Sequence, residues 1–193
     1  YNQFRTSIAY PKLNVKVVAT HGGISVGEDG VTHQCVEDVA MMRALPHTTV
    51  IVPADGIETK EAVKASVDLS GPVYMRLGRP ATPLVYEEGY KFNGRALKFK
   101  VGEPVKLREG RDLTIIATGI MVNEALAAAT SLEKESVDVT VMNVHTIKPL
   151  DEFTITETAK ETGAVVTAEE HSILGGLGGA VAEILVENAH VPM

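Results

Sequence analysis

Hydrophobic and polar positions alternate along the chain in two kinds of pattern. Short apolar runs rich in β-branched residues, typical of buried strands, occupy residues 15–20, 48–52 and 73–77. Between them, residues 34–45 and 56–69 carry apolar side chains at helical spacing, and Asp55 with Glu58 forms a capping-box variant where the second helix begins. Residues 1–10 are predicted to be the end of a helix, which Pro11 breaks.

The same alternation returns in the second half of the chain. Strands are predicted at residues 113–119, 137–144 and 164–168, and helices at 122–132, 152–162 and 180–187. Strands that alternate with helices predict parallel sheets covered on both faces. The expected fold class is therefore α/β, with two three-layer units and mainly parallel sheets. Residues 1–90 form the first unit, 91–110 a connector with small extended pieces, and 111–193 the second unit.

Composition narrows the classes of function. The chain has 193 residues and a net charge of −7, and its acidic residues are spread along it, so we expect no nucleic-acid or membrane partner. A single cysteine, Cys35, cannot form an internal disulfide, which favours a reduced, cytoplasmic setting. No apolar run is long enough to span a bilayer. Because the chain begins at Tyr1 without a methionine, we expect it to be an excerpt of a longer polypeptide.

Candidate chemistry concentrates in the connection between the first strand and the next helix. Residues 20–34, which we call the THGG loop, read THGGISVGEDGVTHQ and hold four glycines, two histidines and two acids. Ligands of α/β sheets bind at the carboxyl ends of strands, where this loop begins. Glycine permits turns with positive φ and the close approach of a ligand. The side chains left to act are His21, Asp29 and His33.

A fourth candidate, Arg79, follows the third strand and is expected at the same edge of the sheet. Together the four side chains suit a small phosphorylated polyol. A guanidinium binds phosphate oxygens, a carboxylate accepts from hydroxyls, and imidazole can donate, accept or carry charge near neutral pH. The alternative is that all four are surface polar residues with capping roles. Arg76 is expected on the opposite face of its strand from Arg79 and ranks below it.

Two further motifs are interpreted as structural. Gly175–Gly179 partly matches a dinucleotide-binding fingerprint, but no strand follows it. We therefore prefer a tight turn that packs a helix against a sheet or a partner subunit. Glu169, Glu170 and His171 could indicate a metal site. Adjacent residues on a strand point to opposite faces, so at most two of these converge, and no metal site is expected.

Several motifs resemble transketolase. Residues 20–34 are similar to the signature of its pyrimidine-binding domain, and the segments VPADG (52–56), MRLGRP (75–80), TIKPLD (146–151) and EEH (169–171) match in the same order. The resemblance covers essentially the whole chain. It implies that residues 1–90 are part of a thiamine-diphosphate pyrimidine-binding domain and that residues 111–193 are a transketolase C-terminal domain. Some bacteria carry this portion as a separate subunit.

The resemblance also implies roles for the candidate residues. His21 and Arg79 would hold the sugar phosphate, while Asp29 and His33 would bond the hydroxyl and carbonyl oxygens near the reacting carbon, with His33 as the catalytic candidate. The complete enzyme would use thiamine diphosphate and a divalent ion, Mg²⁺ or Ca²⁺. It would transfer a two-carbon ketol unit from a ketose phosphate to an aldose phosphate.

What the sequence lacks is equally informative under this resemblance. The family's cofactor-activating glutamate and its metal-holding motif have no counterpart here, so we expect no cofactor or metal on this chain alone. It would be inert without a diphosphate-binding domain or subunit, in a homodimer or a heterotetramer.

Other interpretations stay open. The related thiamine enzymes are 1-deoxyxylulose-5-phosphate synthase and the beta chain of 2-oxo-acid dehydrogenases, although Glu28 and Gln34 favour transketolase. A non-catalytic dimerisation module would keep the fold without the activity. A nucleotide-binding domain would bind its cofactor at Gly175–Gly179.

Overall fold

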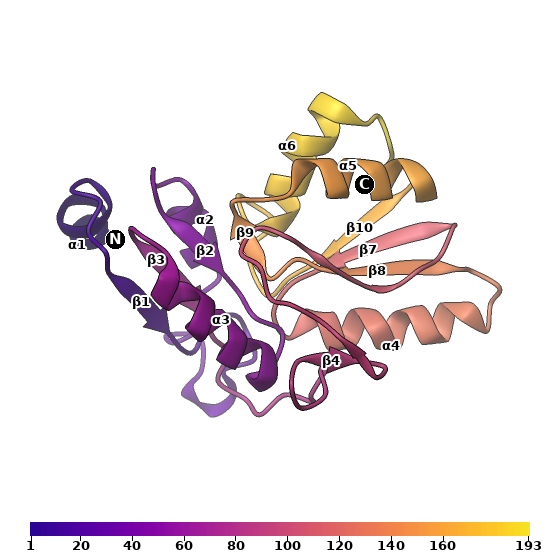
Figure 1. Cartoon of the computed structure of the whole chain (residues 1–193), viewed down its shortest axis with the longest axis horizontal. Helices are drawn as coiled ribbons and strands as arrows, with labels where there is room; N and C mark the ends of the chain where they lie inside the picture. Colours follow the sequence, from indigo (N-terminus) through magenta and orange to yellow (C-terminus); the bar gives the residue numbers. More distant parts are fainter.

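The computed structural model describes residues 1–193 as two α/β units that lie side by side (Figure 1). The first contains α1 (Asn2–Phe4), a π-helical turn (Arg5–Ala9), β1 (Lys16–Ala19), α2 (Asp38–Arg43), β2 (Thr49–Ile51), α3 (Gly56–Asp68) and β3 (Val73–Arg76). A hairpin of β4 (Lys91–Phe92) and β5 (Arg95–Ala96) follows. The rest comprises β6 (Val105–Arg108), β7 (Leu113–Ala117), α4 (Met121–Glu133), β8 (Val139–Asn143), β9 (Thr146–Lys148), α5 (Glu152–Thr162), β10 (Val165–Ala168) and α6 (Leu177–Asn188).

Both sheets are mixed and mostly parallel, which confirms the predicted fold class. The first has the strand order β1-β3-β2-β9, and only β9 runs antiparallel to its neighbour. The second has the order β10-β7-β8-β6, and only β6 is antiparallel. β6 comes from the segment predicted as a connector. β9 was missed, because the sequence pattern indicated only a lead into the next helix, whereas these residues pair with β2 of the first sheet.

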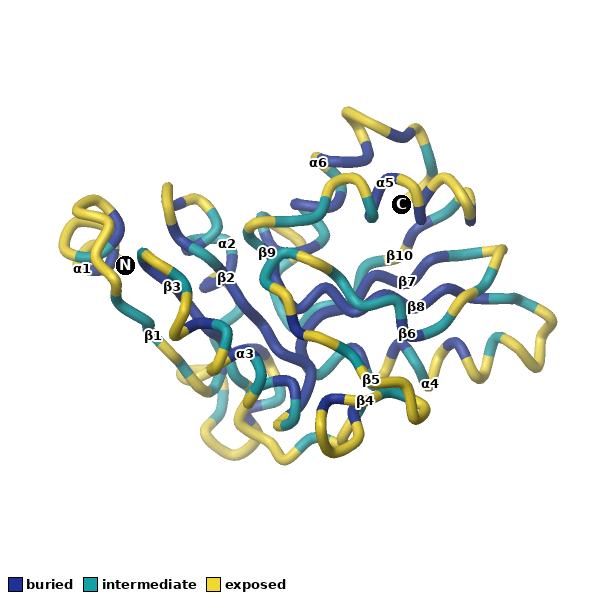
Figure 2. The backbone as a smooth tube through the Cα atoms, viewed as in Figure 1, coloured by how far each residue is buried: buried dark blue, intermediate teal, exposed yellow.

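Strand alternation explains the layers of the first unit. Val50, Val52 and Tyr74 share a buried cluster with α2, whereas Ile51, Val73 and Met75 share a second cluster with α3. In the second unit, α4 covers one face of the sheet and α5 and α6 cover the other (Figure 1). The cluster on the α2 side includes Ile116 of the second sheet, and the cluster on the α3 side includes Ile115. The two units therefore share their cores (Figure 2).

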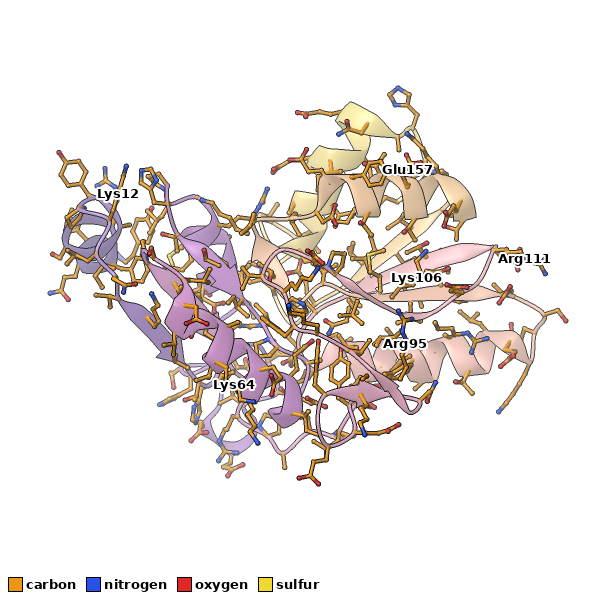
Figure 3. All side chains as sticks on the ribbon, in the orientation of Figure 1. Lys12, Lys64, Arg95, Lys106, Arg111 and Glu157 are labelled. Atoms are coloured by element: carbon orange, nitrogen blue, oxygen red, sulfur yellow. The ribbon has the colours of Figure 1, made fainter.

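Charged side chains lie on the outer surfaces of both units. Lys64 on α3 and Glu157 on α5 are exposed, and Arg111, in the loop before β7, projects from the edge of the molecule (Figure 3). None of the helices is both long and apolar enough to cross a membrane.

A buried polar network around Glu58 joins the units. Asp55 caps α3 as predicted, because its Oδ1 accepts from the Glu58 N–H at 2.8 Å. The Glu58 carboxylate is fully buried and accepts from the Ala54 N–H at 2.7 Å and from the Tyr90 hydroxyl at 2.9 Å. The Nδ2 of Asn143, on β8, also donates to it, at 2.9 Å. Burial raises the pKa of Glu58 to about 7, although these hydrogen bonds oppose the shift.

We expect Glu58→Gln to change how stability depends on pH. The carboxyl has an ordinary pKa of 4.5 and a native pKa of about 7. Between these values the native chain keeps a proton that the unfolded chain has released, so the Glu58 contribution falls as pH rises through this window. In urea unfolding from pH 4 to 8, the free energy of unfolding of the wild type minus that of the variant should decrease across the window and level off above it. A difference that stays constant with pH would contradict this assignment.

Candidate functional site

The THGG loop begins at the carboxyl end of β1 and contains a 3-10 turn at Gly27–Asp29. His21 has a φ of +67°, in the left-handed region where a non-glycine residue is strained, a feature common at functional sites. The returning end of the loop is held by the Gly23 N–H, which donates to the Cys35 carbonyl at 2.7 Å, and by Gln34 Nε2, which donates to the Ile24 carbonyl at 3.0 Å. The helix predicted from residue 34 therefore begins only at residue 38, and that part of the prediction was wrong.

Arg79 lies against the acidic turn of the THGG loop. Its Nε is 2.6 Å from Asp29 Oδ2 and its Nη2 is 2.6 Å from Glu28 Oε1. The hydrogen bond that Arg79 donates to Glu28 raises the pKa of Arg79, and a backbone hydrogen bond together with Arg79 lowers the pKa of Glu28. Loop and strand end thus form one charged rim at the sheet edge.

The two predicted histidines lie on the same loop but do not join this ion pair. His21 Nδ1 is 2.9 Å from the Thr20 hydroxyl, and His33 Nδ1 is 3.0 Å from the Thr32 hydroxyl. Neither imidazole is hydrogen-bonded to Asp29 or Arg79. The structure therefore brings two of the four predicted residues into contact and leaves His33 exposed to solvent.

Arg76 has a different environment from Arg79. It is buried on the α2 side of the sheet, with its Nε 3.1 Å from Asp38 Oδ2, which also accepts from the Tyr74 hydroxyl at 2.7 Å. Burial raises the pKa of Tyr74, and the Asp38 carboxylate raises it further. Arg76 Nη2 donates to the carbonyls of Cys35 at 3.1 Å and Glu170 at 2.7 Å. This arginine links the THGG loop, α2 and the second unit.

Residues 169–171 each have a separate structural partner. The Glu169 carboxylate accepts from the backbone N–H groups of Leu177 at 2.7 Å and Gly178 at 2.9 Å, at the start of α6. Glu170 accepts from Ser25, and His171 Nε2 accepts from the Ala40 N–H at 3.3 Å. The contacts of Glu170 and His171 attach the second unit to the first, whereas those of Glu169 lie within the second unit, so each residue of the motif has a structural role.

The glycine-rich turn before α6 is closed to a phosphate. A helix N-terminus binds anions through its free N–H groups, and here the Glu169 carboxylate already accepts from two of them. Gly176 has no room for a Cβ, which would collide with that carboxylate. The geometry supports the interpretation of this turn as a packing element and argues against a dinucleotide site.

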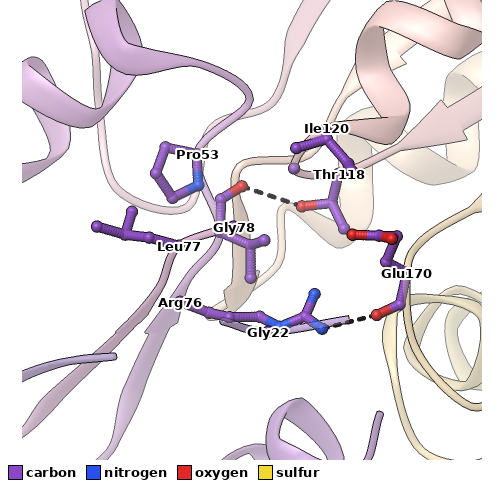
Figure 4. Close-up of a pocket in the computed structure, with 10 residues that line it drawn as sticks. Gly22, Pro53, Arg76, Leu77, Gly78, Thr118, Ile120 and Glu170 are labelled. Carbon is purple, nitrogen blue, oxygen red and sulfur yellow. Dashed lines mark hydrogen bonds between the residues drawn. The ribbon is translucent and has the colours of Figure 1, made fainter. Parts of the chain in front are cut away.

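A small cavity lies at the junction of the units (Figure 4). It contains none of the four predicted substrate residues. The Arg76 guanidinium and the backbone of Glu170 border it, joined by their hydrogen bond (Figure 4). The other lining residues are Gly22, Val52, Pro53, Leu77, Gly78, Thr118, Gly119 and Ile120. The cavity nevertheless adjoins the rim, because Gly22 and Gly78 are the chain neighbours of His21 and Arg79.

Sequence reasoning missed the roles of Asp38, Tyr74 and Glu170. Asp38 gives the one local signal, because an acid inside an otherwise apolar helical pattern needs a cationic side chain as its partner when it is buried. Glu170 gave no such signal, because its partner Ser25 lies 145 residues away in the sequence.

We expect Arg76→Met to destabilise the chain by about 3–5 kcal/mol, because it leaves the buried Asp38 carboxylate without its charged partner. The double variant Asp38→Asn with Arg76→Met should recover part of that loss, since no unpaired charge remains. Urea unfolding of the single and double variants measures both effects. A double variant that is less stable than Arg76→Met alone would show that the ion pair is not the cause.

Comparison with known proteins gives two domain matches. Residues 1–85 match the pyrimidine-binding domain of transketolase, and residues 102–193 match the transketolase C-terminal domain. Between them these matches leave only residues 86–101 uncovered, the region that contains the β4–β5 hairpin.

Individual relatives agree with these matches. The chain is 45% identical, over 193 residues, to a 6-deoxy-6-sulfo-D-fructose transketolase subunit of Clostridium sp. (100% of this chain, 58% of the relative). It is 39% identical, over 186 residues, to an apulose-4-phosphate transketolase subunit of Phocaeicola vulgatus (96% and 58%). A solved split gene transketolase, an inactive beta4 tetramer, is 46% identical with a TM-score of 0.89 (99% and 60%). The chain thus spans between half and two thirds of the length of these relatives.

Proposed function

The chain belongs to the transketolase family, and on this premise we propose that it is the C-terminal subunit of a split, thiamine-diphosphate-dependent transketolase. The observation that supports this best is the Asp29–Arg79 rim, which lies at the carboxyl edge of the sheet in the pyrimidine-binding domain. Relatives that match nearly the whole of this chain are named as transketolase subunits, which favours transketolase over the related synthase and dehydrogenase.

We propose that Arg79 binds the anionic end of the sugar. Its Nε and Nη2 are held by Asp29 and Glu28, and Nη1 has no hydrogen-bond partner. A guanidinium fixed in this way is oriented to donate to a phosphate oxygen without first losing side-chain freedom. Relatives are named for sugars as different as 6-deoxy-6-sulfo-D-fructose and apulose 4-phosphate, so the rim fits an anionic sugar as a class rather than one sugar.

The other rim residues are proposed to bind substrate oxygens. His21 would share the phosphate with Arg79. Asp29 would accept from a sugar hydroxyl, and His33 would donate to oxygen near the reacting carbon, where negative charge develops. Hydrogen bonds that strengthen as this charge forms lower the barrier, and positioning by several side chains reduces the entropic cost.

The cofactor is proposed to come from a partner, because the residues of this chain do not fit its diphosphate and metal. No group of three or more His, Cys, Asp or Glu side chains is arranged to hold a metal ion. The N-terminus of α6 is filled by Glu169. Thiamine diphosphate, bound mainly by the diphosphate-binding subunit, would supply the carbanion chemistry of two-carbon transfer.

Exposed apolar side chains support the presence of a partner. Ile24 is 62% and Val31 80% exposed on the THGG loop, and Ile173 is 88% and Leu174 74% exposed beside residues 169–171. Ile173 and Leu174 are neighbours in the sequence, and Ile24 and Val31 share one loop; exposed apolar patches commonly mark interaction sites. We propose that the diphosphate-binding subunit covers this part of the chain and completes the site.

The first test restores the enzyme by combining the chain with its diphosphate-domain partner and assays two-carbon transfer from xylulose 5-phosphate to ribose 5-phosphate. We expect activity from the pair and none from either polypeptide alone. Arg79→Ala should then lower kcat/KM roughly 10–100-fold, mostly through KM, because a charged hydrogen bond to phosphate is worth about 1.5–3 kcal/mol. Arg95→Ala, an exposed arginine on β5, is the matched control and should keep wild-type kinetics.

His33→Ala should act differently, by lowering kcat as well as kcat/KM, because its contact is made to oxygen that gains charge in the reaction. His190→Ala, at an exposed site near the end of the chain, is the control. Unchanged kinetics in both Arg79→Ala and His33→Ala would remove the site assignment.

A further inference from the structure

We propose that Glu170, which belongs to the second unit, is a positioning residue for the substrate site: its carboxylate sets the conformation of the THGG loop. This inference rests on the proposed function, because it concerns the loop that carries His21, Asp29 and His33. The C-terminal domain contributes none of the predicted substrate residues. Its role would be to hold those of the other domain in their binding geometry.

The contact is made to the loop backbone itself. Glu170 Oε1 accepts from the Ser25 N–H at 2.9 Å, and Oε2 accepts from the Ser25 hydroxyl at 3.0 Å. Both oxygens of one carboxylate thus bind one residue of the loop. Charge-assisted bonds of this kind are roughly twice as strong as neutral ones, and two parallel bonds also fix orientation.

Two glycines make this approach possible. Gly23 has a φ of +91°, which favours glycine, and a Cβ there would collide with the Glu170 side chain. A Cβ on Gly22 would collide with Arg76. The glycine-rich sequence predicts that a ligand approaches the backbone of this loop closely. In the structure, what approaches the glycines is a carboxylate and a guanidinium of the chain itself.

The returning end of the loop is fixed to the same place. Arg76 Nη2 donates both to the Cys35 carbonyl and to the Glu170 carbonyl. The Ser172 N–H donates to the Val36 carbonyl at 2.8 Å. Both ends of the loop are therefore held against residues 170–172.

Residues 26–34 span the two fixed ends and include Asp29 and His33. With its ends fixed, this span has few conformations to lose when a sugar binds, and preorganisation of this kind raises affinity and rate. Loss of the Glu170 carboxylate would free the first end of this span without removing any predicted substrate residue from the chain.

The first measurement is hydrogen–deuterium exchange of the restored two-subunit enzyme, which does not depend on activity. In Glu170→Ala, the amides of residues 22–36 should exchange several-fold faster than in the wild type, while the strands keep their protection. Glu187→Ala, at an exposed glutamate on α6, is the matched control and should leave the loop unchanged. Ser25→Ala removes one of the two bonds and should give an intermediate effect, which keeps the test open if Glu170→Ala folds poorly. Unchanged exchange of the loop in both variants would overturn the proposal.

The second measurement is the kinetics of the same variants. Glu170→Ala should lower kcat/KM for the ketose phosphate roughly tenfold with a raised KM, because the binding residues are no longer held in place. Glu170→Gln keeps one accepting oxygen and should retain more activity than Glu170→Ala. Adding Ser25→Ala to Glu170→Ala should cause little further loss, since both changes remove the same contact.

These outcomes distinguish a positioning role of Glu170 from a role in stability alone. They also distinguish failure of this inference from failure of the proposed function. If Glu170 only stabilised the fold, Glu170→Ala would reduce the fraction of active enzyme, which lowers kcat and leaves KM unchanged. That result would overturn the proposal. If the wild-type pair transfers no two-carbon unit, the proposed function fails, while loop exchange in Glu170→Ala still decides whether Glu170 orders the loop.

Discussion

The hydrogen bonds of Glu170 and Arg76 at the junction of the units determine the shape of the candidate site. Each charged group there has partners from a different part of the chain: Glu170 binds Ser25, and Arg76 binds Asp38 and the Cys35 carbonyl. Arg76 and Asp38 are buried, and a buried charge without a partner is costly, so their pairing strongly favours this arrangement. The half-buried Glu170 adds its two hydrogen bonds to Ser25. The THGG loop takes its conformation from this arrangement rather than from local propensity, which its glycines make weak.

The fold supplies the frame for this junction. The two buried clusters run from one unit into the other, and β9 crosses to pair with β2, so the sheets cannot shift relative to each other without loss of core packing. The Glu58–Asn143 contact ties α3 to the second sheet in the same region. Because the two sheets are fixed relative to each other, the distance from residue 170 of the second unit to the THGG loop of the first is also fixed.

Local patterns predicted much of this structure, and the failures share a cause. Asp55 was recognised as a helix cap because this signal involves near neighbours in the sequence. The alternation of β3 likewise explains why Arg76 lies on the same side of the sheet as Tyr74, against Asp38 of α2. The late start of α2, the strand β9 and the partner of Glu170 were missed, because each depends on a long-range contact that leaves no periodic trace. The Asp29–Arg79 contact could be anticipated, since the carboxyl ends of adjacent parallel strands meet at one edge. The positions of the His21 and His33 rings relative to Asp29 and Arg79 could not be anticipated, because contacts within and around the loop determine where its side chains lie.

The central claim is that a charged rim on the first unit, held in place by the second, binds the sugar phosphate. Its most direct test is an experimental structure of the restored two-subunit enzyme with a bound ketose phosphate. The account predicts the phosphate within hydrogen-bond distance of the Arg79 guanidinium, sugar oxygens next to His33 and Asp29, and the Glu170–Ser25 bonds intact. A phosphate bound elsewhere, with Arg79 still paired only to Glu28 and Asp29, would contradict it.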